Sequence, residues 1–100
     1  MRRYTTPTVT VTVEGVDITG CTVYVTIAQG QHAATFEDAP MELVDADTVI
    51  SVDMSQCDTA GFRPGLAKVQ VNWIDEFGKR NASQEGAIAI DGNLLDRVLP

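Results

Sequence analysis

Alternation of polar and apolar residues is the dominant pattern of this chain. Residues 8–13 alternate Thr and Val at every position, and residues 21–27 place Val23, Val25 and Ile27 on one face. A period of two is typical of a β-strand with one buried face, and β-branched side chains favour an extended backbone. We therefore predict a strand at each place, with these apolar side chains directed inward.

The middle of the chain repeats the pattern less regularly. Residues 48–54 alternate clearly, whereas residues 33–37 and 41–44 are short segments between turn-forming residues. We predict strands at all three places. Ser55 can cap a helix, and Asp58 stands at the position that returns the capping bond. One short helical turn is therefore expected near residues 55–60.

A long β-hairpin is predicted from residue 65 to residue 90. Its first arm alternates and contains the only tryptophan, Trp73, at the same parity as Val69 and Val71. Residues 75–79 provide the turn, and the second arm ends in a small-residue and isoleucine alternation. The shared parity predicts that Trp73 lies at the centre of the core.

About seven short strands with almost no helix indicate an all-β fold, an antiparallel immunoglobulin-like β-sandwich. A small closed barrel is the alternative. Cys21 and Cys57 both precede Trp73, so the usual order of an immunoglobulin cysteine pair around its tryptophan is absent. A length of 100 residues predicts a single domain over 1–100, with a short basic N-terminal arm (1–6) and an apolar C-terminal tail (93–100).

The net charge of the chain limits the classes of partner that it can bind. Fourteen acidic and seven basic residues give a net charge of −7 and a pI near 4.3, which disfavours binding to nucleic acid. The N-terminus continues into a Thr/Val alternation rather than an apolar run, so we expect no signal peptide, no membrane partner and an intracellular chain. Cys21 and Cys57 are then expected to be reduced.

Candidate chemistry is sparse. The single histidine, His32, would have to act with Cys21 or Cys57 to form a nucleophile and base. Both cysteines are more simply interpreted as small apolar residues. No familiar zinc spacing occurs in the sequence. We therefore expect no enzymatic activity and no cofactor.

A ligand-binding sandwich, for carbohydrate or calcium, remains the alternative function. Asp45 and Asp47 in one predicted loop and the 91–93 segment in another offer oxygen ligands, although Asp and Asn are also common turn residues. Tyr24 stands on the polar side of its strand, where it would serve as a binding residue, a cross-strand partner or part of an interface.

Strand edges carry the strongest functional potential, because an open sandwich exposes unpaired backbone groups that another chain can extend. The Thr-rich first strand and the apolar tail are candidates for such contact, although Glu14 and Asp53 would blunt these edges. The candidate interface residues are Thr8, Thr10, Thr12, Tyr24, Leu95, Val98 and Leu99.

Several stretches support a resemblance to a known family. They are RRYTTPT at 2–8, TVISV at 48–52, TAGF at 59–62, Gly65, VQVNW at 69–73 and GKR at 78–80. Together they resemble small prophage-encoded proteins of structural-gene regions, similar in layout to the immunoglobulin-like N-terminal domain of phage baseplate upper proteins. The resemblance implies a non-enzymatic structural or assembly protein. Its partners would be other phage structural proteins or further copies of itself, in the bacterial host cytoplasm during assembly or in the virion.

Overall fold

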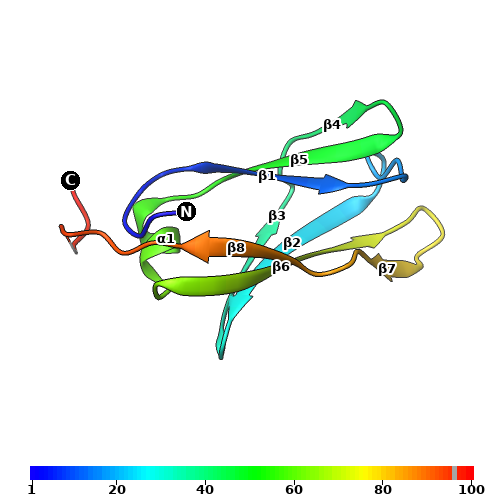
Figure 1. Ribbon diagram of the computed structural model, residues 1–100. Coiled ribbons are helices and arrows are strands. Elements are labelled where there is room, and N and C mark those ends of the chain that lie inside the picture. Colours follow the sequence, from blue (N-terminus) through cyan, green and yellow to red (C-terminus); the bar gives the residue numbers. More distant parts are fainter. Residues whose placement is uncertain (96) are drawn as a thin grey trace.

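The computed structural model describes residues 1–95 and 97–100. These residues form eight strands and one short helix (Figure 1). The elements are β1 (Thr8–Val13), β2 (Thr22–Gln29), β3 (His32–Glu37), β4 (Met41–Val44), β5 (Asp47–Asp53), α1 (Gln56–Ala60), β6 (Gly65–Ile74), β7 (Arg80–Ala82) and β8 (Gly86–Ile90).

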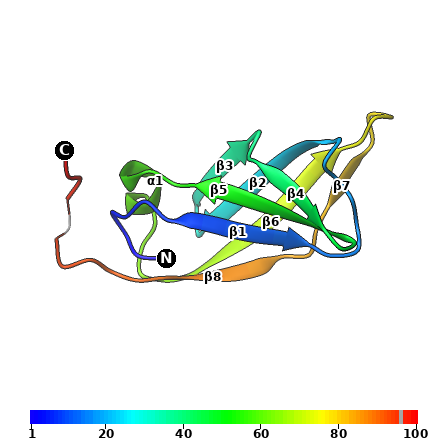
Figure 2. The ribbon, with the colours of Figure 1, turned by 90° about the horizontal axis from the view of Figure 1, so that it is seen from above.

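Two antiparallel sheets face each other as the layers of a sandwich (Figures 1 and 2). One sheet has the order β1-β5-β4. The other has the order β3-β2-β6, and both β7 and β8 pair with β6. The predicted all-β antiparallel sandwich is confirmed, and two separate sheets are present in place of a single closed barrel.

The strand order supports the immunoglobulin-like description. β1, β5 and β4 take the places of immunoglobulin strands B, E and D, while β3, β2, β6 and β8 take those of C′, C, F and G. A full first strand, A, is missing from this arrangement in the described part of the chain. Its place lies beside β1 and β8.

The N-terminal arm partly fills this place. Arg2 bridges Asp91 in the parallel sense, next to the end of β8. The Met1 amine donates to the Ala89 carbonyl at 2.7 Å, the Asp91 N–H donates to the Met1 carbonyl at 2.7 Å, and the Arg3 N–H donates to the Asp91 carbonyl at 2.9 Å. The arm is therefore hydrogen-bonded to the edge of β8.

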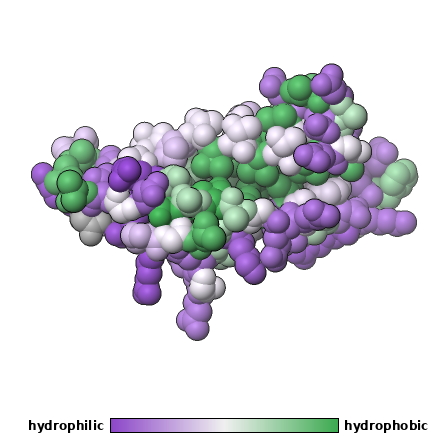
Figure 3. Space-filling model, viewed as in Figure 1, coloured by the Kyte–Doolittle hydropathy of each residue, from purple (hydrophilic) through white to green (hydrophobic). Residues whose placement is uncertain are grey.

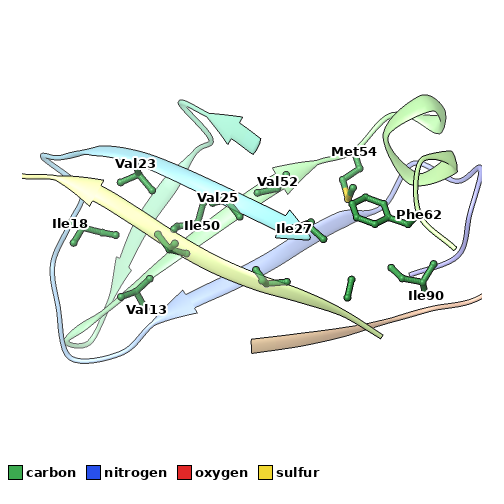
Figure 4. Close-up of a cluster of buried hydrophobic side chains, with 13 residues drawn as sticks. Val13, Ile18, Val23, Val25, Ile27, Ile50, Val52, Met54, Phe62 and Ile90 are labelled. Atoms are coloured by element: carbon green, nitrogen blue, oxygen red, sulfur yellow. The ribbon is translucent and has the colours of Figure 1, made fainter. Parts of the chain in front are cut away.

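The core lies between the two sheets, and its side chains come from alternate strand positions (Figure 4). Val25, Ile27, Ile50 and Val71 are completely buried, as their parity predicts. Phe62 is also 0% exposed and lies under α1. It is the largest fully buried side chain, and it closes the core at the end where the two termini lie.

Trp73 does not lie at the centre of the core. It faces the core side of its sheet, as its parity requires, but it is only half-buried and lies at the margin. Parity fixes which face a residue occupies and does not fix its depth along the strand. Beside Trp73 the second hairpin arm is interrupted at Ser83. In place of regular strand pairing, the Ser83 N–H donates to the Val71 carbonyl and the Val71 N–H donates to Ser83 Oγ.

Capping residues explain the short helix. The Asp58 N–H donates to Ser55 Oγ at 3.1 Å, and the Ser55 N–H donates to Asp58 Oδ2 at 2.9 Å, so the predicted reciprocal cap is confirmed. Gly61 follows with an ordinary right-handed backbone. A Cβ atom there would lie 2.6 Å from His32 Nε2, so any larger residue would require the His32 side chain to move.

Candidate functional site

β1 is an edge strand of the smaller sheet. Within the described chain β1 pairs with β5 alone, in register from Thr8 opposite Asp53 to Val13 opposite Thr48. Thr8, Thr10 and Thr12 are exposed on the outer face, as predicted. The Thr8 hydroxyl donates to Asp53 Oδ1 at 2.6 Å, so the Asp53 carboxylate is directed to a neighbouring hydroxyl group.

The other edge strands differ from β1 in charge. β4 contains Glu42, β3 ends in Glu37, and β7 begins with Arg80. Charged side chains at such places discourage a further strand from pairing. β1 and β8 contain no charged residue, and both border the same side of the sandwich. The uncharged edges are therefore adjacent.

A groove separates these two edges. It has a volume of about 510 Å³. Its apolar lining comes from Val11, Val13, Val16, Val69 and Trp73, and its polar lining from Thr12, Glu14, Ser83 and Gln84. Figure 3 shows a hydrophobic band along this side, between the strands that Figure 1 labels β1 and β8. We call it the β1–β8 groove. The half-buried position of Trp73 follows from the opening of this groove.

The C-terminal tail presents a second apolar surface. Leu95, Val98 and Leu99 are 45%, 48% and 43% exposed, and Leu94, which the sequence analysis did not select, is 107% exposed. Gln56 of α1 holds the far end of the tail through two bonds to the Leu99 backbone, at 2.9 and 2.7 Å. Asp96, which belongs to the predicted tail, lies outside the described residues.

Tyr24 lies in a different place, on the outer face of the larger sheet. A shallow pocket of about 340 Å³ there, the Tyr24 pocket, is lined by Tyr24, Thr26, Thr35, Asn72, Ile74 and Arg80. Arg80 donates from Nε and Nη2 to Asn72 Oδ1 at 3.3 and 3.2 Å, and the two threonine hydroxyls lie 3.1 Å apart. The pocket thus combines a ring, a cation and hydroxyl groups.

The predicted interface residues therefore occupy three separate places: the β1 edge, the tail and the Tyr24 pocket. The groove between β1 and β8 was not predicted from the sequence. The sequence nevertheless contains a pattern that could have indicated the groove: the GAIAI segment of β8 contains no charged residue, and neither does β1.

The two cysteines do not form a disulfide. Both are free; Cys21 is half-buried just before β2, whereas Cys57 is exposed on α1 at the other end of the sandwich. Burial and the nearby carboxylates of Asp75, Glu76 and Asp17 raise the pKa of Cys21. His32 packs edge-on against Phe62 with 4.7 Å between ring centroids.

The two acidic loops lie at opposite ends of the sandwich. Asp47 begins β5, and its carboxylate accepts the Gly15 N–H at 2.8 Å. Asp91 follows β8 at the end where α1 lies. Over residues 1–95 and 97–100, no group of three or more His, Cys, Asp or Glu side chains is placed to hold a metal ion. The calcium alternative thus gains no site from these loops.

No helix in the described ranges has the length and apolar character needed to cross a membrane. Comparisons of the chain with protein-family models, curated protein sequences and solved structures find no match. The groove, the tail and the Tyr24 pocket are the surfaces that point to a function.

Proposed function

We propose that this protein acts by protein-protein contact through the β1 edge, as a non-enzymatic structural or assembly protein of a phage or prophage. One observation carries the proposal: β1 is a six-residue edge strand without charge, and no other strand of the described chain pairs along its outer side. Natural edge strands that stay unpaired are usually protected by charge, proline or a bulge.

The mechanism is the addition of a strand to the smaller sheet. A partner strand would satisfy the free N–H and C=O groups of β1, and its side chains would enter the β1–β8 groove beside Val11 and Trp73. Main-chain hydrogen bonds supply affinity in this mode, and the pockets for alternate side chains supply specificity. The exposed threonines Thr8, Thr10 and Thr12 would border the new contact.

The phage context is supported by the sequence resemblance. It points to other phage structural proteins or further copies of this chain as partners, with assembly in the bacterial host cytoplasm. The combination Thr10→Lys and Thr12→Lys would place two charges on the β1 edge without changing buried residues. Ala33→Lys with Thr35→Lys is the matched control, because both positions are exposed on the edge strand β3.

The test is co-expression with the products of the genes that flank this gene, followed by co-purification. We expect a stable complex that the β1 substitutions abolish and the β3 substitutions preserve. A complex that tolerates both lysines on β1, or a flanking region without phage structural genes, would contradict the proposal.

A second candidate function is carbohydrate binding at the Tyr24 pocket. An aromatic ring beside hydroxyl, amide and guanidinium groups matches the polar and stacking contacts that a sugar needs. NMR titration with a panel of oligosaccharides would then shift the signals of Tyr24 and Asn72. Tyr24→Ala should remove the response, while Phe77→Ala, at an aromatic residue 81% exposed elsewhere, should leave it unchanged.

A further inference from the structure

We propose that the β1–β8 groove binds the C-terminal tail of a second copy of this chain as an added strand. This inference rests on the proposed role of the β1 edge and names its partner. Two uncharged edges border the groove, and apolar side chains line it between them together with the carboxylate of Glu14.

The groove corresponds to the place of an immunoglobulin first strand. In the complete fold such a strand lies beside the strand that β1 represents. Here residues 1–3 occupy only the end of β8, at residues 89–91. The remaining part of the β8 edge, from Gly86 to Ile88, and the whole outer edge of β1 stay open in the described structure.

The tail supplies a segment of suitable length and composition. Residues 94–100, when extended, would span roughly 23 Å, and the six residues of β1 span roughly 20 Å. Leu95, Arg97 and Leu99 would lie on one face of the added strand, and Leu94 and Val98 on the other. The first face would carry two leucine side chains and a cation into a groove that Glu14 also lines.

The tail does not reach the groove of its own chain. Residues 1–3 already occupy the edge of β8 at the point where the chain leaves that strand. Gln56 then holds Leu99 beside α1, and Figures 1 and 2 show the tail continuing beyond the end of β8, away from the groove. The occupant therefore comes from a second copy.

Such a contact joins two different surfaces, so each copy offers one groove and one tail. Two copies that exchange tails reciprocally form a closed symmetric dimer, and copies joined head to tail form larger rings or open chains. The groove and the tail can be disabled separately by substitution. The groove variant carries Thr10→Lys and Thr12→Lys, and the tail variant carries Leu94→Ser, Leu95→Ser, Val98→Ser and Leu99→Ser.

Sedimentation velocity over a concentration series tests the inference on the full chain. The wild-type protein should form a dimer or larger assemblies whose fraction grows with concentration, and each variant alone should remain a monomer. An equal mixture of the two variants should form a dimer with one copy of each, because the intact tail of one variant enters the intact groove of the other. The control replaces four exposed apolar residues elsewhere by serine and should assemble like the wild type; these are Leu43, Val44, Leu66 and Phe77.

The remaining outcomes separate this inference from the proposed function. A tail variant that assembles like the wild type overturns the inference but leaves contact through the β1 edge intact. A monomeric wild-type protein also overturns it, while a complex with a flanking gene product would still support the proposed function. A groove variant that assembles normally overturns the inference, and it overturns the proposed function as well if the same variant keeps the complex with a flanking gene product.

Discussion

The side-chain hydroxyl of Thr59 donates to the backbone oxygen of Thr5 at 2.9 Å and accepts from the backbone N–H of the same residue at 3.1 Å. Thr59 is fully buried in α1, so this pair of hydrogen bonds fastens the N-terminal arm to the helix. Thr48 does the same at the other end of the sandwich, where it donates to the Val16 carbonyl and accepts from the Ile18 N–H. Each buried threonine thus anchors one loop.

Replacing Thr59 by valine keeps the shape of the side chain and removes both bonds. The backbone groups of Thr5 would lose their partner, and we expect a loss of about 1–3 kcal/mol in the free energy of unfolding. Urea denaturation measures this loss. Thr59→Ser keeps the hydroxyl and should lose less; a loss in Thr59→Ser as large as that in Thr59→Val would contradict the leading contribution of the two hydrogen bonds.

Phe62 and Trp73 differ in burial and should differ in their contribution to stability. Phe62→Ala would leave a cavity in a fully buried site and should cost about 3–5 kcal/mol. Trp73→Ala should cost less, because Trp73 is only half-buried beside an open groove. Denaturation of both variants under the same conditions gives the order, and a larger loss for Trp73 would contradict this assignment of the core.

Much of the fold could be predicted from the sequence, because local patterns determine it. The alternation in β1, β2 and β5 fixes which side chains face inward, and Ser55 with Asp58 fixes the start of α1. The depth of Trp73 could not be predicted in this way. It depends on where the second hairpin arm is interrupted by Ser83, and a serine at that position carries no distinctive local pattern.

The candidate site was predictable only in part. The uncharged β1 edge is visible in its sequence, and so is the apolar character of the tail. The groove arises from the meeting of β1 with β8, two strands that are remote in the chain and belong to different sheets. The docking of Thr5 on Thr59 likewise joins residues that no periodic pattern connects.

Cys21 should react more slowly than Cys57 with an alkylating reagent at mildly alkaline pH. Burial and nearby carboxylates raise the pKa of Cys21, so a smaller fraction of this thiol is the reactive thiolate, whereas Cys57 is exposed. Mass spectrometry of Cys21→Ser and Cys57→Ser variants follows each thiol separately. Faster modification of Cys21 would contradict the assigned environment.

The raised pKa of Cys21 also predicts an alkaline loss of stability. The folded chain holds the thiol proton more tightly than the unfolded chain, whose thiol titrates near the ordinary value of 9.0. The stabilising contribution is complete below that pH and is lost as the pH rises toward the higher folded pKa. Cys21→Ala should make the free energy of unfolding less dependent on pH above 9, as measured by urea denaturation at several pH values.

Gln56→Ala should strengthen self-association. Its side chain makes two hydrogen bonds to the Leu99 backbone, and their loss would release the tail for binding to another copy. A net value near 1.4 kcal/mol for the two bonds corresponds to about a tenfold lower dissociation constant. Sedimentation measures the change against Gln31→Ala, an exposed glutamine elsewhere. Unchanged association would show that the tail is not restrained by Gln56.

The parallel pairing of Arg2 with Asp91 has a practical consequence for the design of expression vectors. The Met1 amine donates a hydrogen bond to the Ala89 carbonyl. If further residues were fused before Met1, this nitrogen would become a peptide amide and would still have one N–H to donate. Residues fused before Met1 would then be directed along β8 toward Gly86, into the groove itself. An N-terminal purification tag should therefore compete with the partner strand, and binding measurements require its removal by a protease.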